Sequence, residues 1–346
     1  NLGDELVFAG LRRLLADQGA ELAAISLDPA ATRRTHGVGA VAHTDAAGIW
    51  RALGQADALV FGGGGLLQDT TSPFNLPYHL ARPVLARLRA VPVVGLGLGA
   101  GALDTRLGRA QVRAVTRRFD GLTVRDRQSQ DLLARLGVPD VRLGADLAYA
   151  LAPADLPGSA SDGTLVVCLR PWSGQRGRLP AAARGDQTPQ PQVEVLAAGL
   201  DRIAQQTGLK VRFVALQADR DDALHARVAA AMRSPSSRAT PTLLEVLAEV
   251  AAATAVVSMR YHGGVAAVLA GRPVVLVDYA AKVASLAEDL GPAARLLAWD
   301  PQALTTLPEA LTEVLPARDD LLAARERLLS RHEVTREALA DLALTR

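Results

Sequence analysis

The stretch Ala255-Val256-Val257-Ser258-Met259-Arg260-Tyr261-His262-Gly263-Gly264 passes from a short apolar run, through a polar turn, to a segment that begins with two glycines. The apolar run has the length and composition of a buried strand, and residues 263–270 are predicted to be helical. A buried strand followed by a helix is the repeating unit of a parallel sheet that helices cover on both faces.

The same unit recurs along the 346 residues. The strands predicted are residues 21–27, 58–61, 91–96, 121–124, 141–143, 164–169, 211–216, 255–258 and 274–277. The helices predicted between them are residues 4–17, 49–55, 76–89, 106–119, 129–136, 193–206, 222–232, 243–252 and 263–270. We also expect a strand before Asn1, because the chain begins with the helix of such a unit.

Residues 153–163 are rich in Pro, Gly and Ser and form the best candidate linker. We therefore expect a first domain over residues 1–152 and a second over residues 164–300. Helices over residues 301–346 are expected to pack across both domains. The predicted fold class is α/β, with two Rossmann-like doubly wound domains facing across a cleft in a GT-B-like arrangement. Ligands of such folds bind at the carboxyl ends of the strands.

The composition excludes several classes of protein. Hydrophobic residues make up 49% and charged residues 21%, which is globular and not disordered. The net charge of +2 is too small for a nucleic-acid coat, but it suits a cleft that takes anions. The single cysteine, Cys168, lies in an apolar run and is expected to be buried and inert. It excludes an internal disulfide and a cysteine-rich zinc site.

No apolar stretch is long enough to span a bilayer, and the sequence carries no signal peptide. We expect a cytoplasmic protein. A peripheral contact with the inner face of the membrane stays open, because residues 173–192 form an arginine-containing loop that could meet a lipid-linked acceptor. The sequence contains no metal-binding motif, and the oligomeric state is left open.

Two glycine-rich stretches follow predicted strands. Gly62-Gly63-Gly64-Gly65-Leu66-Leu67-Gln68-Asp69 offers backbone amides at Gly63, Gly64 and Gly65 for a phosphate or carboxylate. Asp69 is either a helix cap or a general base. The second stretch, residues 95–101, lacks the spacing of a dinucleotide fingerprint, and Arg125 stands where a ribose would need an acid. We therefore expect no nicotinamide cofactor.

Polar residues at other predicted strand ends give further candidates. Asn1 and Asp4 open the first helix, either as an ordinary cap or at the mouth of the cleft. Arg125 and Arg170 each follow a strand, and each is either a surface arginine or an anion ligand.

Arg260, His262 and Gly263 form the strongest candidate site. A helix N-terminus beside an arginine and a histidine is a compact anion site with a titratable group. The next unit along the chain ends in Asp278-Tyr279-Ala280-Ala281-Lys282, so Lys282 is expected to point into the same cleft as His262.

Taken together, these motifs resemble the polysaccharide pyruvyl transferase family, most closely its CsaB-type enzymes. The resemblance rests on the segments Asn1-Leu2-Gly3-Asp4-Glu5, Phe61-Gly62-Gly63-Gly64-Gly65-Leu66-Leu67-Gln68-Asp69, Gly97-Leu98-Gly99-Ala100-Gly101, Thr123-Val124-Arg125-Asp126, Leu169-Arg170-Pro171-Trp172 and Ser258-Met259-Arg260-Tyr261-His262-Gly263. They occur in the family's order, although Tyr261 stands where the family often has Leu.

The resemblance implies transfer of the pyruvyl group of phosphoenolpyruvate onto two hydroxyls of one sugar, giving a pyruvate ketal and phosphate. The acceptor implied is N-acetylmannosamine of a lipid-linked secondary cell-wall polymer precursor, whose ketal supports S-layer anchoring. Phosphoenolpyruvate is a co-substrate, and no cofactor or metal is implied. The second domain would bind phosphoenolpyruvate and the first the acceptor.

The implied chemistry assigns roles to the candidate residues. Arg125, Arg260 and Lys282, with the amides near Gly263, would bind the two anionic groups of phosphoenolpyruvate. His262 or Lys282 would protonate its methylene carbon. Asp4 or Asp69 would act as the base for a sugar hydroxyl.

Two other functions stay open. A GT-B glycosyltransferase would use the same fold and bind a nucleotide sugar. A non-catalytic sugar- or nucleotide-binding protein would bind its ligand without releasing phosphate.

Overall fold

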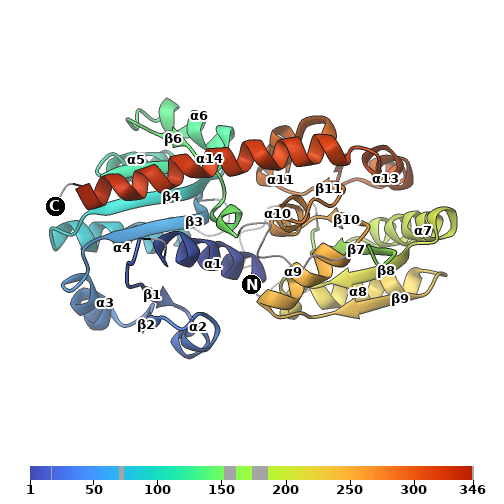
Figure 1. The fold of residues 1–346 in the computed structure, drawn as a ribbon, viewed down its shortest axis with the longest axis horizontal. Coiled ribbons are helices and arrows are strands. Elements are labelled where there is room, and N and C mark those ends of the chain that lie inside the picture. Colours follow the sequence, from blue (N-terminus) through green and yellow to red (C-terminus); the bar gives the residue numbers. More distant parts are fainter. Residues whose placement is uncertain (17, 70–73, 152–160, 174–185, 345–346) are drawn as a thin grey trace. The chain divides into compact units, whose positions relative to one another are not determined.

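The structure is a computed structural model that describes residues 1–16, 18–69, 74–151, 161–173 and 186–344. The chain forms two compact units, which we call unit 1 and unit 2. Unit 1 contains Asn1–Leu6 and Leu151–Leu329, and unit 2 contains Val7–Ala150 and Ser330–Arg346. Each unit is an α/β fold with a parallel sheet, and the elements are labelled in Figure 1.

This division differs from the expected domains at both ends of the chain. The first turn of α1 (Leu2–Ala16) belongs to unit 1, with the second half of the sequence. The terminal helix α14 (Arg318–Leu344) is divided between the units at Leu329. Most of the expected linker, residues 153–163, and most of the expected loop, residues 173–192, lie outside the described residues.

Unit 1 is built on a six-stranded sheet in the order β12-β11-β10-β7-β8-β9, with every neighbouring pair parallel. Its strands are β7 (Thr164–Cys168), β8 (Lys210–Val214), β9 (Ser236–Ala239), β10 (Ala255–Ser258), β11 (Val274–Asp278) and β12 (Ala294–Ala298). The buried residues of β7, β10 and β11 are almost all aliphatic, as expected for central parallel strands. The carboxyl ends of β11, β10, β7 and β8 therefore lie side by side.

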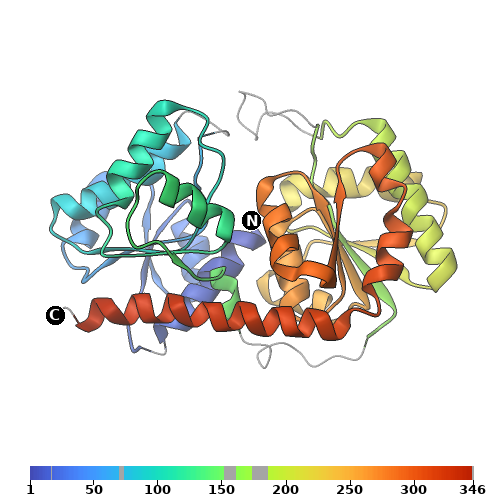
Figure 2. The ribbon, with the colours of Figure 1, turned by 90° about the horizontal axis from the view of Figure 1, so that it is seen from above.

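Helices cover both faces of this sheet (Figure 2). The helices of unit 1 that follow its first strand are α7 (Gln190–Thr207), α8 (Ala218–Ala231), α9 (Leu243–Ala252), α10 (Tyr261–Leu269), α11 (Ala281–Leu290), α12 (Pro301–Leu304) and α13 (Leu307–Val314). One face packs on α7, α8, α12 and α13, where alternate strand residues such as Val167 and Phe213 are fully buried. The other face packs on α9, α10 and α11.

Three elements of unit 1 were not predicted. The strand β9 is the edge of the sheet and reads Ser-Ser-Arg-Ala with no fully buried side chain, so it lacks the apolar signal of a strand. The helix α11 and the strand β12 lie in a region for which no element was expected, and β12 is the opposite edge strand.

Unit 2 contains a four-stranded parallel sheet in the order β3-β4-β5-β6 and a separate parallel pair, β1-β2. Its strands are β1 (Ala23–Ser26), β2 (Gly39–Ala42), β3 (Leu59–Leu67), β4 (Val93–Ala100), β5 (Gly121–Val124) and β6 (Arg142–Leu143). Its helices include α2 (Pro29–His36), α3 (Ala46–Leu53), α4 (Asn75–Leu88), α5 (Arg106–Thr116), α6 (Arg127–Arg135) and the 3-10 turn η1 (Leu147–Ala150).

Two apolar clusters hold unit 2 together. Residues of α4, α5 and α6 pack on one set of strand positions, including Val93 and Val124. Residues of α1 and of the last part of α14 pack on the alternate positions Val94 and Leu96. Successive residues of β4 thus point to opposite faces of the sheet, and both faces are buried. Neither α2 nor β2 was predicted, because both are short and only His36 of α2 is buried.

The strand β3 does not stop at the glycine run. This differs from the prediction, in which the strand ended at Phe61. The strand β3 continues through Gly62–Gly65 to Leu67 and keeps its pairing with β4, with a register shift between Gly64 and Leu67. Gly63 and Gly64 have φ values of 73° and 83°, which are accessible to glycine at low cost. The glycines therefore form an irregular strand end, and β4 likewise extends beyond its predicted end to Ala100.

No helix within the described ranges combines the length and the apolarity needed to cross a bilayer.

Candidate functional site

The carboxyl edge of the unit 1 sheet carries three of the predicted site residues. Arg170 follows β7, His262 lies in the first turn of α10 after β10, and Lys282 lies in the first turn of α11 after β11. All three side chains are partly buried. Because β11, β10 and β7 are neighbours in the sheet, their ends form one continuous edge.

The first turn of α1 reaches the same edge. The Leu2 amide donates to the carbonyl of Leu216, which follows β8, at 2.8 Å. Gly3 is buried against the imidazole of His262, and a Cβ placed on Gly3 would lie only 2.4 Å from the His262 Nδ1 atom. A glycine at this position is therefore required by the position of the imidazole.

Asn1 and Asp4 lie beside this contact and are exposed. The Asn1 side chain accepts from the Gly3 amide at 3.1 Å and donates to the Asp4 carboxylate at 2.7 Å. Asn1 thus caps the first turn of α1. The second of these hydrogen bonds ties the Asp4 carboxylate to the start of α1.

Arg260 does not present an open charge, which differs from the expectation that it is a cation ready for an anionic substrate. Its guanidinium forms a two-point ion pair with Asp221 of α8: Nε donates to Oδ2 at 3.0 Å, and Nη2 donates to Oδ1. Asp221 is fully buried and Arg260 is 8% exposed. A carboxylate held this way neutralises the arginine, so the ion pair positions the turn before His262.

His225, one helical turn after Asp221, holds the loop that carries Arg170. Its Nε2 atom accepts from the Leu169 amide at 3.1 Å, and the imidazole is fully buried. Burial lowers the pKa of His225 to about 4, although Asp221 opposes the shift. The imidazole is therefore neutral near pH 7 and acts as a fixed hydrogen-bond acceptor.

Arg170 and Lys282 meet at the phenol of Tyr279, the first residue after β11. Arg170 Nη1 donates to the Tyr279 Oη atom at 3.0 Å, and its guanidinium carbon lies 4.4 Å from the ring centroid. The Lys282 ammonium nitrogen is 5.6 Å from the same centroid. Two cations therefore lie close to one phenol at the edge of the sheet.

Gly263 was predicted to bind substrate through its amide. In the structure this amide donates to the Arg260 carbonyl at 3.0 Å, and the lack of a side chain serves packing. A Cβ on Gly263 would lie 2.4 Å from the Ser258 hydroxyl and 3.2 Å from the Cβ of Cys168. Cys168 is buried, as predicted, and burial raises the pKa of its thiol to about 12. The thiol is accordingly unreactive in the folded protein.

In unit 2, Arg125 is buried between two carboxylates. Its Nε and Nη1 atoms lie 3.3 Å from Asp126 and 3.3 Å from Asp146, respectively. Its guanidinium also lies against Gly99, where a Cβ would come within 2.8 Å of Nη2. The charge of Arg125 is therefore balanced within the fold, which differs from the expectation of a cation open to substrate.

The three glycines of β3 that were predicted to bind substrate have different surroundings. A Cβ on Gly63 would overlap a methyl group of Val7, so Gly63 serves packing. A Cβ on Gly64 would meet nothing within 4 Å. The nearest atom to a Cβ on Gly65 would be Arg125 Nη2, at 3.9 Å. Gly64 and Gly65 thus have the space that a ligand would need.

Asp69 holds the loop before α5. It accepts from the amides of Asp104 and Thr105, at 2.8 Å and 3.0 Å, and from the Thr105 hydroxyl at 2.5 Å. Burial alone would raise the pKa of Asp69, but these hydrogen bonds lower it below its usual range. A carboxylate with three donors and a low pKa is a poor base. These hydrogen bonds make Asp69 an anchor of the loop before α5, which differs from both roles predicted for it.

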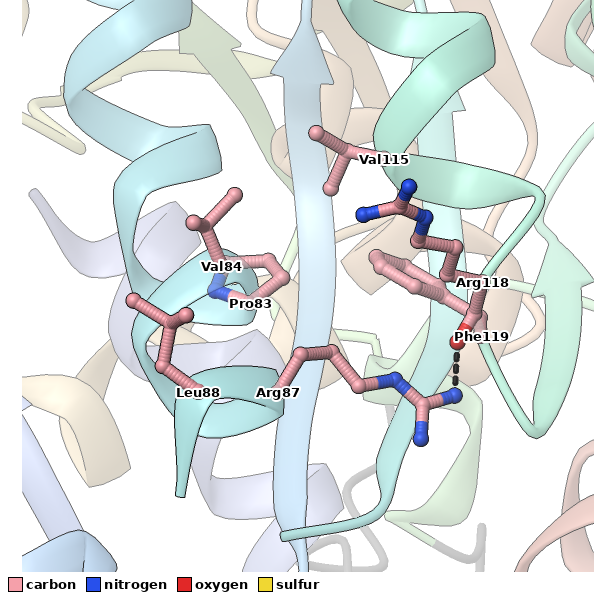
Figure 3. Close-up of a pocket in the computed structure, with 7 residues that line it drawn as sticks. All are labelled: Pro83, Val84, Arg87, Leu88, Val115, Arg118 and Phe119. Atoms are coloured by element: carbon pink, nitrogen blue, oxygen red, sulfur yellow. Dashed lines mark hydrogen bonds between the residues drawn. The ribbon is translucent and has the colours of Figure 1, made fainter. Parts of the chain in front are cut away.

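A hollow in unit 2 is lined by side chains of α4, of α5 and of the turn that follows α5, namely Pro83, Val84, Arg87, Leu88, Val115, Arg118 and Phe119 (Figure 3). In Figure 3 the Arg87 side chain crosses this hollow and donates to the Arg118 carbonyl. The hollow contains none of the predicted site residues. Across the part of the chain that the structure describes, no group of three or more His, Cys, Asp or Glu side chains is placed to hold a metal ion.

Sequence reasoning missed Asp221 and His225, and it did not select Tyr279. Asp221 and His225 are four residues apart on α8, so they share one face of the helix. The helix was predicted over residues 222–232 and so began one residue after Asp221, whereas α8 begins at Ala218. Tyr279 was quoted within the segment that carries Lys282 but was given no role.

A sequence model of the polysaccharide pyruvyl transferase family matches residues 1–280 of the chain. No protein with a curated description matches the chain in sequence. Solved structures that resemble it include a UDP-GlcNAc 2-epimerase from Neisseria meningitidis, at a TM-score of 0.63 and 10% identity, covering 99% of this chain and 98% of that one.

Two further solved structures share the fold. A glycosyltransferase from Rickettsia africae has a TM-score of 0.61 and 9% identity, with 99% and 94% of the two chains covered. Anabaena Alr3699/HepE, in complex with UDP and glucose, has a TM-score of 0.57 and 14% identity, with 96% and 95% covered. At these identities the likeness concerns the fold alone, and it confirms the predicted class of two Rossmann-like α/β domains of GT-B type.

Proposed function

Because the chain belongs to the polysaccharide pyruvyl transferase family, we propose that it transfers the pyruvyl group of phosphoenolpyruvate onto two hydroxyls of one sugar. The products are a cyclic pyruvate ketal and inorganic phosphate. The observation that supports this proposal most strongly is the meeting of Arg170, Lys282 and His262 at one edge of the unit 1 sheet.

Phosphoenolpyruvate carries a carboxylate and a phosphate, so its site needs fixed cations. Arg170 and Lys282 supply them, and the N-terminus of α10 adds a favourable dipole. Arg260 and Arg125 are held by carboxylates of the fold. We therefore propose that Arg260 orients His262, and that Arg125 holds Asp126 and Asp146 together in unit 2.

The reaction requires one proton to be added to carbon and two to be removed from oxygen. Protonation of the methylene carbon uses the electrons of the carbon–carbon double bond and leaves C2 as an oxocarbenium-like electrophile. The first sugar hydroxyl adds to C2 and loses its proton. Phosphate then leaves with its bonding electrons, and the second hydroxyl adds and loses its proton to the phosphate. The sum is one phosphoenolpyruvate and one diol converted into one ketal and one phosphate.

His262 is suited to the departure of phosphate. Its imidazole is fixed by the backbone of Gly3 and lies next to the uncapped N-terminus of α10. An imidazole there can carry the proton of the second hydroxyl to the leaving phosphate. Asp4, in the first turn of α1 next to Gly3, is retained as a candidate base, whereas Asp69 is not.

The finer assignment follows the CsaB-type resemblance. We propose an acceptor that contains N-acetylmannosamine within a lipid-linked secondary cell-wall polymer precursor, reached at the inner face of the membrane. The ketal carboxylate on the finished polymer would then support S-layer anchoring. The assignment of the acceptor to residues of unit 2, and the lack of a cofactor, stay predictions.

The experiment is an assay of phosphate release from phosphoenolpyruvate with and without an N-acetylmannosamine-containing acceptor. We expect release only when the acceptor is present. His262→Ala is expected to abolish the release while the circular dichroism spectrum stays unchanged. Near-normal release by this variant would remove His262 from the reaction.

Two parallel arms separate the other candidate functions. Release of a nucleoside diphosphate from a nucleotide sugar, without turnover of phosphoenolpyruvate, would identify a glycosyltransferase. Binding of a sugar or nucleotide without any turnover would identify a binding protein.

A further inference from the structure

The hydroxyl of Tyr279 stands out at the unit 1 edge because both of its immediate polar neighbours are cations. Arg170 donates to it at 3.0 Å, and the Lys282 ammonium nitrogen lies 5.6 Å from the centroid of its ring. An arginine side chain can only donate, so the phenol oxygen accepts from Arg170. Its own O–H is left to point to another partner.

The charges around Tyr279 change its acidity. Burial alone would raise the pKa of Tyr279, but the charges of Lys282, Arg170 and Arg260 together lower it to about 8. The ordinary value for tyrosine is about 10. A phenol with this pKa gives up its proton more readily than a surface tyrosine and takes it back near neutral pH.

The ring of Tyr279 is also fixed in place. It packs edge-on against Trp172, with ring centroids 5.6 Å apart and an interplanar angle of 64°. Trp172 is itself held at both backbone groups: its carbonyl accepts from Trp299 Nε1 at 3.2 Å, and its amide donates to the Thr188 hydroxyl at 3.2 Å. A proton donor needs this kind of fixed geometry to act on a carbon atom.

We propose that Tyr279 is a catalytic residue that protonates the methylene carbon of phosphoenolpyruvate and then accepts the proton of the first sugar hydroxyl. This inference rests on the proposed function and deepens it. In the first step the Tyr279 O–H bond breaks and a C–H bond forms with the electrons of the double bond. The phenolate that results is stabilised by Arg170 and Lys282. In the second step the sugar oxygen bonds to C2, and its proton returns to the phenolate.

This assignment explains why Lys282 and Tyr279 lie together. Lys282 was predicted as one of two candidates for the acid that protonates the methylene carbon. In the structure its ammonium nitrogen lies 5.6 Å from the centroid of the Tyr279 ring. Lys282 then serves as a cation that binds substrate and stabilises the phenolate, and the proton comes from Tyr279.

The test compares wild-type protein with Tyr279→Phe and, as a matched control, Tyr78→Phe. Tyr78 is an exposed tyrosine of α4 in unit 2 whose hydroxyl bonds to His43. We expect Tyr279→Phe to lower kcat by about 10²- to 10⁴-fold, the range typical of a general acid. Its dissociation constant for phosphoenolpyruvate, measured by calorimetry, should change less than about 10-fold. Tyr78→Phe should keep both values.

A second measurement needs no turnover. Tyrosine ionisation is followed by ultraviolet difference absorbance between pH 6 and 10 in the substrate-free protein. Wild type should show one tyrosine that ionises near pH 8, and this step should be missing in Tyr279→Phe and present in Tyr78→Phe. The wild-type kcat should fall as pH rises through the same range, because the donor is the protonated phenol.

The possible outcomes separate this proposal from the proposed function. If wild type does not release phosphate from phosphoenolpyruvate with the acceptor, the proposed function fails. If wild type is active and Tyr279→Phe keeps more than about a tenth of its kcat, Tyr279 is not the proton donor. Loss of phosphoenolpyruvate binding in Tyr279→Phe, in proportion to the loss of activity, would also overturn the proposal and leave Tyr279 as a binding residue.

Discussion

The imidazole of His262 lies directly on the backbone of Gly3, with no room for a side chain between them. These residues are far apart in the sequence, and both lie within the range that the family model matches. The contact lies within unit 1, because Asn1–Leu6 belong to that unit. Residues at the beginning of the chain therefore determine where the imidazole can stand.

The first prediction concerns Gly3. In Gly3→Ala the new methyl group would overlap His262 Nδ1, so the imidazole must move. Displacement of a catalytic group by about 1 Å can cost about 10²-fold in rate. We expect a loss of this size in acceptor-dependent phosphate release. Gly39→Ala is the control, because the nearest atom to a Cβ there is 3.6 Å away. Equal activity of the two variants would show that the Gly3 contact does not position His262.

The second prediction concerns the buried ion pair of Asp221 and Arg260. Asp221→Asn leaves the arginine charge buried without its counter-ion, which typically costs about 3–5 kcal/mol. The neighbouring Asp222→Asn removes an exposed pair with Arg238, for which the cost is about 0–1 kcal/mol. Thermal unfolding should therefore shift strongly in the first variant and little in the second. Equal shifts would contradict the structural role given to Asp221.

The third prediction concerns the pH dependence of stability. Burial lowers the pKa of His225 to about 4, and burial lowers that of His332 in unit 2 to about 4 as well. Both lie below the unfolded value of about 6.5, so as pH falls the unfolded chain takes up protons first. The folded protein therefore has its full stability with respect to these two histidines above about pH 6.5. As pH falls toward 4, the free energy of unfolding decreases by up to about 1.4 kcal/mol per pH unit for each histidine.

The measurement is the melting temperature between pH 4.5 and 7.5. His225→Gln keeps an acceptor for the Leu169 amide but does not titrate, so its melting temperature should fall less steeply at low pH. A slope equal to that of wild type would mean that His225 is not held neutral.

The fourth prediction separates the two roles considered for Asp69. As a loop anchor, Asp69→Asn should lower the free energy of unfolding by about 1–3 kcal/mol, since one of its charged hydrogen bonds is lost. Its kcat should stay within about 10-fold of wild type, because no proton transfer is removed. A loss of about 10³-fold in kcat at unchanged melting temperature would instead make Asp69 the base.

Much of the fold could be predicted from the sequence because its central strands are apolar throughout. The bounds of β5, β10 and α9 agree with those predicted. The edge strand β9 was missed because its side chains are polar or small. The end of β3 was predicted too early, because a run of glycines usually indicates the end of a strand. Here the backbone of the glycines keeps its pairing with β4.

The sequence predicted which motifs form the candidate site, but it did not predict which side chains pair with one another there. The order of strands and helices was enough to bring Arg170, His262 and Lys282 to one edge. The Arg260–Asp221 ion pair joins residues 39 positions apart, and the Leu169–His225 hydrogen bond joins residues 56 positions apart. A local sequence pattern cannot predict which residues pair over such separations. The sequence therefore identified the charges, and the structure shows which of them are already neutralised.

The most direct test of the central claim is to follow the carbon of phosphoenolpyruvate into the product. Phosphoenolpyruvate labelled with ¹³C at C2 is incubated with the protein and an N-acetylmannosamine-containing acceptor, and the acceptor is examined by mass spectrometry and ¹³C NMR. The account predicts that the label appears on the acceptor as a quaternary ketal carbon, with one phosphate released per label transferred. Phosphate release that leaves the label in free pyruvate, or an acceptor that stays unlabelled in every condition, would contradict it.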